Sequence, residues 1–158
     1  VLLKNRKDIK LTLVGEGSVK TELVSKIRET NANVDIFDRQ PVHVAKDMIK
    51  KADIGLVSLS SNVYRYAYPG KIMTYLEQGK PIISVIEKES EIVKLMELEN
   101  YGFCIPTLDP EKISQYLVKI LENKSWKLKM SSNATNAYKK YFSKDIILSK
   151  WSNVLATK

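Results

Sequence analysis

Residues that could bind an anion stand at two points where the sequence predicts the start of a helix. Gly15 and Gly17 precede Ser18, and because glycine has no side chain, the backbone N–H groups of such a turn can approach a ligand closely. Lys71 follows Pro69-Gly70 at the start of another helix, where its charge and the positive end of the helix could act together on a phosphate. A plain tight turn and a solvated surface lysine are the alternatives at these two points.

Two further polar side chains stand near such turns. Thr74 lies one helical turn after Lys71, and its hydroxyl could form a hydrogen bond to a ligand. Arg39 follows the end of a predicted strand and could contact a phosphate or a flat base. We therefore treat both residues as candidate ligand contacts.

Residues for nucleophilic or metal chemistry are scarce. His43 is the only histidine and Cys104 the only cysteine, and the acids show no metal-loop spacing, so no metal site is expected. We expect His43 at a helix start or on the surface, and Cys104 as a buried thiol. No catalytic residue can be assigned. A single cysteine excludes an internal disulfide and favours a reducing, cytoplasmic setting.

Alternating strand and helix patterns must position these residues. Short apolar runs predict strands, the third of them buried, over residues 9–14, 34–37, 53–59, 82–86 and 102–105. Helical spacings lie between them, with Ser18 as the cap of the first predicted helix. Three successive helices end the chain, and their aromatic residues Tyr138, Tyr141 and Trp151 are interpreted as helix core.

Strands that alternate with helices pair in parallel through right-handed crossovers. We therefore predict an α/β fold, a doubly wound, Rossmann-like parallel sheet with helices on both faces and three closing helices. In such folds ligands bind outside the carboxyl ends of the strands. The loops that follow the predicted strands are thus the segments expected to form a site.

The stretch from Tyr64 to Ile83 contains the signals for a loop, a short helix and a strand. Three apolar residues recur at helical spacing in it, Ile72, Tyr75 and Leu76. Gly79 stands where a helix often ends with a left-handed residue, and Pro81 follows where a helix cannot continue. Residues 82–86 then form an apolar run typical of a strand covered on both faces.

Composition limits the classes of function. The chain has 158 residues, 44% hydrophobic and 28% charged, which suits a single domain over residues 1–158 without a membrane span. The net charge of +8 is compatible with nucleic acid, an anionic membrane surface or phosphate-bearing ligands. The aromatic residues are not interleaved with basic ones as RNA-binding modules require, so no nucleic acid partner is expected.

The order of these residues resembles the donor-binding, C-terminal domain of GT-B glycosyltransferases, particularly family 4 (glycosyl transferases group 1). The residues that match the family's central signature are Pro69, Lys71, Ile72, Tyr75, Leu76, Gly79, Lys80, Pro81, Ile82 and Ile83. Further matching segments are Val14-Gly15-Glu16-Gly17, Ala52-Asp53-Ile54, Glu91-Ile92-Val93, Tyr101-Gly102-Phe103 and Asp109-Pro110-Glu111.

The sequence departs from the family at two positions of the site. Thr74 stands where the family usually has a glutamate that binds the donor ribose, and Tyr66 stands where the second glutamate of that pair would fall. Glu77 is an alternative carboxylate nearby. Tyrosines at alternate positions could line the sugar or acceptor side, or else pack over a sheet edge, and they are Tyr64, Tyr66 and Tyr68.

The resemblance implies the donor nucleotide-sugar-binding half of a glycosyltransferase of hexosyltransferase type. Such an enzyme moves a sugar from a nucleoside diphosphate to a saccharide or lipid-linked acceptor, here in bacterial surface polysaccharide synthesis. The donor-binding residues implied are Gly15, Gly17, Ser18, Arg39, Pro69, Gly70, Lys71, Thr74 and Glu91. No cofactor is implied, because the nucleotide-sugar is the substrate.

The resemblance also implies a fragment without the N-terminal acceptor domain, which on its own would bind without turnover. Its expected location is the cytoplasm, including the inner face of the cell membrane. A non-catalytic nucleotide-binding or scaffold subunit that completes an enzyme with a partner chain is one alternative. A nucleotide-sugar epimerase is another.

Overall fold

A computed structural model describes residues 2–3 and 5–156 of the chain, which form two compact units. The first unit covers residues 1–48 and the second residues 49–158, so the division falls inside helix α2 (Val42–Lys51). The strands accordingly form two parallel sheets, one in each unit, where the sequence had suggested one. The single-domain organisation stays a prediction.

The first unit pairs strands β1 (Leu11–Val14) and β2 (Val34–Phe37) in parallel, joined by helix α1 (Lys20–Thr30). The prediction that Ser18 caps this helix is wrong. Val19 is the residue before the helix, and no side chain caps the first turn. Ser18 therefore belongs to the preceding turn, because the chain becomes helical only at Lys20.

The second unit contains a three-stranded parallel sheet in the order β3 (Gly55–Ser58), β4 (Ile82–Val85), β5 (Gly102–Ile105). All four residues of the central strand β4 are buried, as its apolar run predicted. The prediction of a buried strand at β3 is only half right. Leu56 and Ser58 are exposed because β3 lies at the edge of this sheet and alternates between a covered and an open face.

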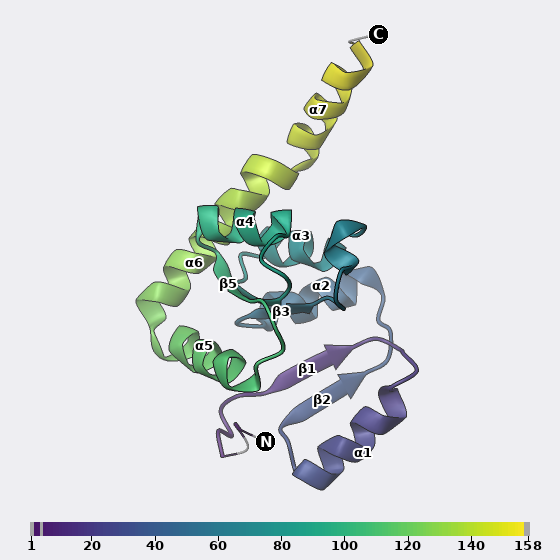
Figure 1. Cartoon of the computed structure of the whole chain (residues 1–158), viewed down its shortest axis with the longest axis vertical. Helices are drawn as coiled ribbons and strands as arrows, with labels where there is room; N and C mark the ends of the chain where they lie inside the picture. The colour runs from purple at the N-terminus through teal and green to yellow at the C-terminus, as the bar shows by residue number, and fades with distance from the viewer. Residues whose placement is uncertain (1, 4, 157–158) are drawn as a thin grey trace. The chain divides into compact units, whose positions relative to one another are not determined.

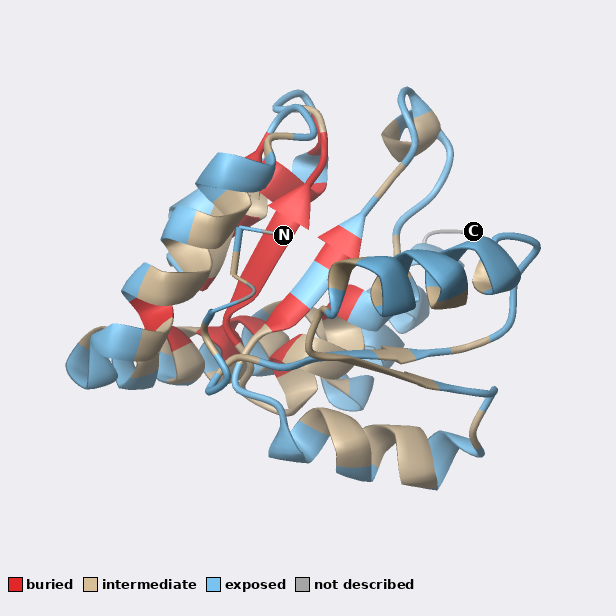
Figure 2. Cartoon of the chain, turned by 90° about the horizontal axis from the view of Figure 1, so that it is seen from below, coloured by how far each residue is buried: buried red, intermediate tan, exposed pale blue. Residues whose placement is uncertain are grey.

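Helices cover both faces of this sheet, as predicted (Figure 1). Residues of α3 (Gly70–Glu77), α4 (Glu91–Glu99) and α6 (Lys124–Ala137) share one apolar cluster with Ile82 of β4. Residues of α5 (Pro110–Glu122) share the opposite cluster with Ile83. Neighbouring residues of a strand point to opposite faces, so β4 supplies both clusters. Figure 2 shows the buried residues in red on strands and on parts of the helices.

Local capping chemistry sets the ends of the helices in this unit. Helix α3 ends as predicted, because Gly79 is left-handed (φ 61°) and the N–H of Lys80 donates to the Tyr75 carbonyl at 2.8 Å. The Ser90 hydroxyl accepts the N–H of Ile92 at the start of α4. Asp109 accepts the N–H of Lys112 at the start of α5. The cap at Gly79 thus sets where the connection after α3 begins, and the caps at Ser90 and Asp109 set where the loops before α4 and α5 end.

The chain closes with three helices, as predicted: α5, α6 and α7 (Lys144–Ala156). A π-helical turn, Tyr138–Phe142, joins α6 to α7. The interpretation of Trp151 as core is wrong, because its side chain is 61% exposed and α7 extends beyond the sheet (Figure 1). None of the helices in the described residues combines the length and the apolar character needed to cross a membrane.

Candidate functional site

The loop between β3 and α3 contains a short 3-10 turn, Val63–Arg65, which includes Tyr64. The turn starts at Asn62, which is left-handed (φ 65°), and Asn62 donates its backbone N–H to the Glu87 carboxylate at 2.7 Å. The Arg65 guanidinium lies 5.8 Å from the centre of the Tyr64 ring. The segment therefore has a defined conformation, which places Tyr66 and Tyr68 beyond the turn.

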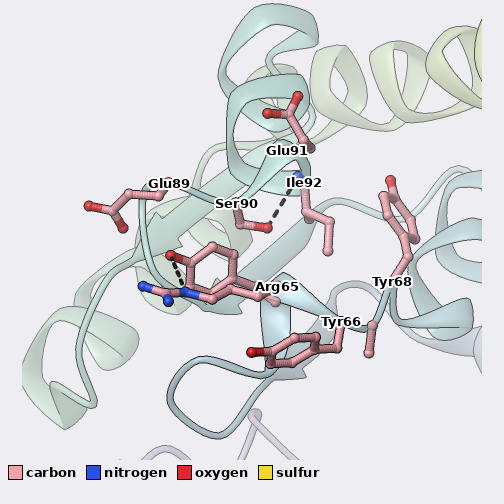
Figure 3. Close-up of a pocket in the computed structure, with 9 residues that line it drawn as sticks. Arg65, Tyr66, Tyr68, Glu89, Ser90, Glu91 and Ile92 are labelled. Atoms are coloured by element: carbon pink, nitrogen blue, oxygen red, sulfur yellow. Dashed lines mark hydrogen bonds between the residues drawn. The ribbon is translucent and has the colours of Figure 1, made fainter.

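The loop between β4 and α4 faces this segment. Ser90 is 2% exposed, and its hydroxyl accepts the Ile92 N–H at 3.3 Å, which holds the loop against the first turn of α4. Glu89 and Glu91 extend on either side of Ser90 (Figure 3), and Glu91 pairs with Lys94 at 2.6 Å. The loop thus presents a buried hydroxyl between two exposed carboxylates.

A cavity of about 410 Å³ lies between these two loops (Figure 3). Its lining consists of Tyr64, Arg65, Tyr66, Ala67, Tyr68, Glu89, Ser90, Glu91 and Ile92. Partial burial raises the pKa of Tyr68 to about 12, so its hydroxyl stays protonated at neutral pH and can donate a hydrogen bond. Aromatic rings beside carboxylates can bind a ligand that has apolar ring faces and hydroxyl groups.

The signature residues at the start of α3 directly follow, in the sequence, the residues that line this cavity. Pro69 is extended (ψ 111°) and precedes Gly70, the first residue of the helix, while Lys71 is exposed in the first turn. Thr74 is half-buried one turn further on. The structure places these residues together at the start of α3, adjacent to the residues that line the cavity.

The remaining candidates lie in the first unit at the carboxyl ends of its strands. Val14 of β1 pairs with Phe37 of β2, and Gly15 is in a left-handed conformation (φ 146°) just beyond. Open space surrounds the α-carbons of Gly15 and Gly17, so a ligand can approach this turn. Arg39 is exposed two residues after β2, and Lys20 forms an ion pair with Asp38 beside it.

The structure therefore collects the candidates into two groups. Gly15, Gly17, Ser18 and Arg39 belong to the first unit, whereas Pro69, Gly70, Lys71, Thr74 and Glu91 belong to the second. Within each unit the residues lie at the carboxyl ends of parallel strands, as predicted. The union of both groups in a single site stays a prediction.

Sequence reasoning missed Arg65 and Glu89 as individual lining residues. Both lie in loops that follow a strand, which is the signal that could have identified them. No described group of three histidines, cysteines or acids could hold a metal ion. His43 is exposed near the start of α2, and the Cys104 thiol is half-buried, with its pKa raised by burial, and donates to the Ile86 carbonyl at 3.1 Å.

Two solved structures illustrate the fold that this chain shares. A structure of TarM from S. aureus, in complex with Fondaparinux, alpha-GlcNAc-glycerol and UDP, superposes with a TM-score of 0.77 at 16% identity, covering 96% of this chain and 30% of that chain. HepE from Anabaena, in complex with UDP-glucose, superposes with a TM-score of 0.76 at 18% identity, covering 96% and 42%. These likenesses show a Rossmann-like fold of the GT-B type.

Sequence comparison identifies the family. A probable glycosyltransferase, WbjE from Pseudomonas aeruginosa, is 25% identical over 122 residues, which cover 77% of this chain and 30% of WbjE. The chain thus spans less than a third of that relative's length. The model of the glycosyl transferases group 1 family matches residues 1–123. The resemblance read from the loop and helix signatures is confirmed, and the chain belongs to the glycosyl transferases group 1 family.

Proposed function

We propose that this chain is the donor-binding half of a glycosyltransferase that moves a hexosyl unit from a nucleoside diphosphate to a saccharide or lipid-linked acceptor. The observation that carries the proposal is the cavity between the β3–α3 and β4–α4 loops, at the carboxyl ends of parallel strands in a chain of this family. The TarM and HepE structures were solved in complex with UDP and UDP-glucose, respectively. We infer surface polysaccharide synthesis in bacteria as the process.

The chemistry of each segment suits a different part of such a donor. The Gly15–Ser18 turn and Lys71 offer N–H groups and a positive charge to the diphosphate, and would stabilise the charge that develops on the leaving group. Thr74 would bond a ribose hydroxyl, and Arg39 would contact the base or a phosphate. We infer that the reaction uses no cofactor.

The cavity itself suits the sugar better than the diphosphate. Two carboxylates, Glu89 and Glu91, line the cavity together with one guanidinium, Arg65, so the charged groups of the lining are more negative than positive and disfavour a diphosphate. Carboxylates accept hydrogen bonds from sugar hydroxyls, and the ring of Tyr66, 86% exposed, can pack against a sugar face. We therefore assign the sugar to Tyr66, Tyr68 and Glu91.

Nucleotide binding can be tested by thermal denaturation with UDP, GDP, ADP and their glucose conjugates. A ligand at a hundred times its dissociation constant should stabilise the chain by about 2.7 kcal/mol. Sugar conjugates should stabilise it more than the free diphosphates. The proposal fails if none of the nucleotides changes the melting temperature.

A substitution separates phosphate recognition from general binding. Replacing Lys71 with Ala should weaken UDP by about tenfold and leave uridine unchanged, because only UDP carries the diphosphate. Lys129→Ala, at an exposed lysine of α6, is the matched control and should affect neither ligand. Equal loss for UDP and uridine would show that Lys71 does not contact phosphate.

A second function is favoured by one observation. Thr74 and Tyr66 replace the two glutamates of the family's pair, which suits a non-catalytic nucleotide-binding subunit that completes an enzyme with a partner chain. Thr74→Glu tests where the ribose binds, because restoring a carboxylate should strengthen UDP binding if the ribose lies against α3. Sugar transfer by the full-length protein would then exclude the subunit function.

We infer the cellular location of the protein from the acceptor that we propose for it. A lipid-linked acceptor would be met in the cytoplasm at the inner face of the membrane, and the net charge of +8 favours anionic lipid. Sedimentation with phosphatidylglycerol vesicles should decrease as salt rises from 50 to about 300 mM. Binding that is independent of salt would exclude an electrostatic origin. We expect the chain on its own to bind the donor without turnover.

A further inference from the structure

The carboxylate of Glu87 connects the two loops that form the cavity. Its Oε1 accepts a hydrogen bond from the backbone N–H of Asn62 at 2.7 Å, across 25 residues of sequence. Asn62 belongs to the β3–α3 loop and Glu87 to the β4–α4 loop, so one hydrogen bond joins the opposite walls. Glu87 is not among the residues that line the cavity.

The bond is formed at the residue that starts the 3-10 turn. Asn62 has a positive φ of 65°, a left-handed conformation that asparagine adopts more readily than most residues. Its own side chain makes no capping hydrogen bond to the 3-10 turn that it starts. The turn continues when Arg65 donates its N–H to the Asn62 carbonyl at 3.2 Å. The Glu87 carboxylate therefore holds the first residue of the turn that leads into Tyr66.

Electrostatics keep this carboxylate in the charged form that accepts best. The Asn62 N–H holds the pKa of Glu87 below its usual value, and the nearby Arg65 charge acts in the same direction. The pKa of Arg65 is raised, first by the Tyr64 hydroxyl and further by Glu87 and Glu89. The charges of the two loops thus favour the conformation in which the walls are joined.

We propose that Glu87 is a positioning residue that sets the affinity for the sugar part of the donor by holding Tyr66 and Tyr68 opposite Ser90. The proposal rests on the proposed function. Glu87 acts through Asn62 and does not contact the ligand. Loss of the hydrogen bond would leave the β3–α3 loop distributed over several conformations, of which only a fraction could close around a sugar, and the apparent affinity falls by that fraction.

Hydrogen exchange tests the loop without any ligand. Glu87→Ala removes the acceptor, so the Asn62 amide should exchange at least about tenfold faster than in the unsubstituted chain. Glu87→Gln keeps a carbonyl oxygen that can accept the same bond and should restore exchange to within about threefold. Glu97→Ala, at an exposed acid of α4, is the control. Unchanged exchange in Glu87→Ala would overturn the proposal.

Calorimetry with UDP-glucose and UDP then tests the effect on binding. Glu87→Ala should weaken UDP-glucose by about tenfold and UDP by less than about threefold, with recovery in Glu87→Gln. Equal loss of both ligands, or no loss of UDP-glucose, would overturn the assignment to the sugar. If the unsubstituted chain binds neither ligand, the proposed function fails, and the exchange experiment still decides whether Glu87 holds the loop.

Discussion

The two units of the chain contain the same alternation of strands and helices but bury it to different extents. In the second unit, all four residues of β4 are buried, with an apolar cluster on each face of the sheet. In the first unit, all four residues of β1 pair with residues of β2, yet none of the described residues there is buried. Hydrogen bonding thus defines both sheets, whereas only the second contains a core that helices cover from two sides.

The comparison also divides the candidate site. The first unit contributes an open glycine turn, whose backbone groups could contact a ligand. The second contributes a lysine, tyrosines and carboxylates on loops that are anchored by a buried sheet. A rigid sheet can hold side chains in place for recognition, while an open turn supplies N–H groups to a phosphate.

The two units should differ most in the unfolding free energy that is lost when an apolar side chain is truncated. Leu76→Ala removes a side chain that is 0% exposed and should cost about 3 kcal/mol of unfolding free energy. Leu13→Ala, at a half-buried position of β1, should cost about 1 kcal/mol. Both tryptophans lie in the second unit, so urea unfolding followed by fluorescence should report the first change and be almost blind to the second. Similar losses by fluorescence would contradict the comparison.

Glycine substitutions should show the same contrast on a smaller scale. A β-carbon on Gly102 would overlap the Ile82 carbonyl oxygen, so Gly102→Ala should force β4 and β5 apart at a cost of about 2 kcal/mol. Gly17→Ala meets open space and should change stability by less than about 0.5 kcal/mol. Thermal denaturation of both variants measures the difference. A neutral Gly102→Ala would mean that the strand pair is looser than described.

Ligand binding can show whether the two units act on one donor. Gly17→Ala and Lys71→Ala should each weaken UDP by about tenfold, or about 1.4 kcal/mol, if both contact the diphosphate. The double variant reveals coupling, because residues that act on the same group give non-additive losses. No effect of Gly17→Ala on UDP would remove the first unit from the site.

Ion pairs should give the smallest difference. Lys140, together with the Tyr141 hydroxyl, holds the pKa of Glu99 below its ordinary value of 4.5. The resulting stabilisation is therefore complete above about pH 4.5 and is lost as the pH falls through the folded-state pKa. Glu99→Gln should cost about 0.5 kcal/mol at pH 7 and clearly less at pH 2.5.

The exposed pair Lys10–Asp35 of the first unit is the comparison for Glu99. Asp35→Asn should cost less than about 0.3 kcal/mol at pH 7. Urea titrations at pH 7 and pH 2.5 measure both effects. A loss for Glu99→Gln that is as large at pH 2.5 as at pH 7 would show that its charge is not the cause.

Local chemistry alone determined much of this fold. The left-handed Gly79 and the apolar run of β4 are each specified by neighbouring residues, so the sequence predicted them correctly. The Ser90 and Asp109 caps also depend only on residues close in the sequence. The family signature likewise depends on residue order, and it identified the family. Roles of single residues at the ligand stay predictions, because a role requires a partner molecule.

Only the tertiary structure decided which of the predicted faces are covered. Helical spacing placed Trp151 on the apolar face of its helix, but it did not predict that this residue of α7 is exposed. The apolar run of β3 did not predict that this strand lies at the edge of its sheet. The hydrogen bond from Asn62 to Glu87 joins residues of two loops, and no local sequence pattern predicts it. The physical reason is that periodicity fixes the direction of a side chain within its own element, whereas its burial and its partners depend on segments far away in the sequence.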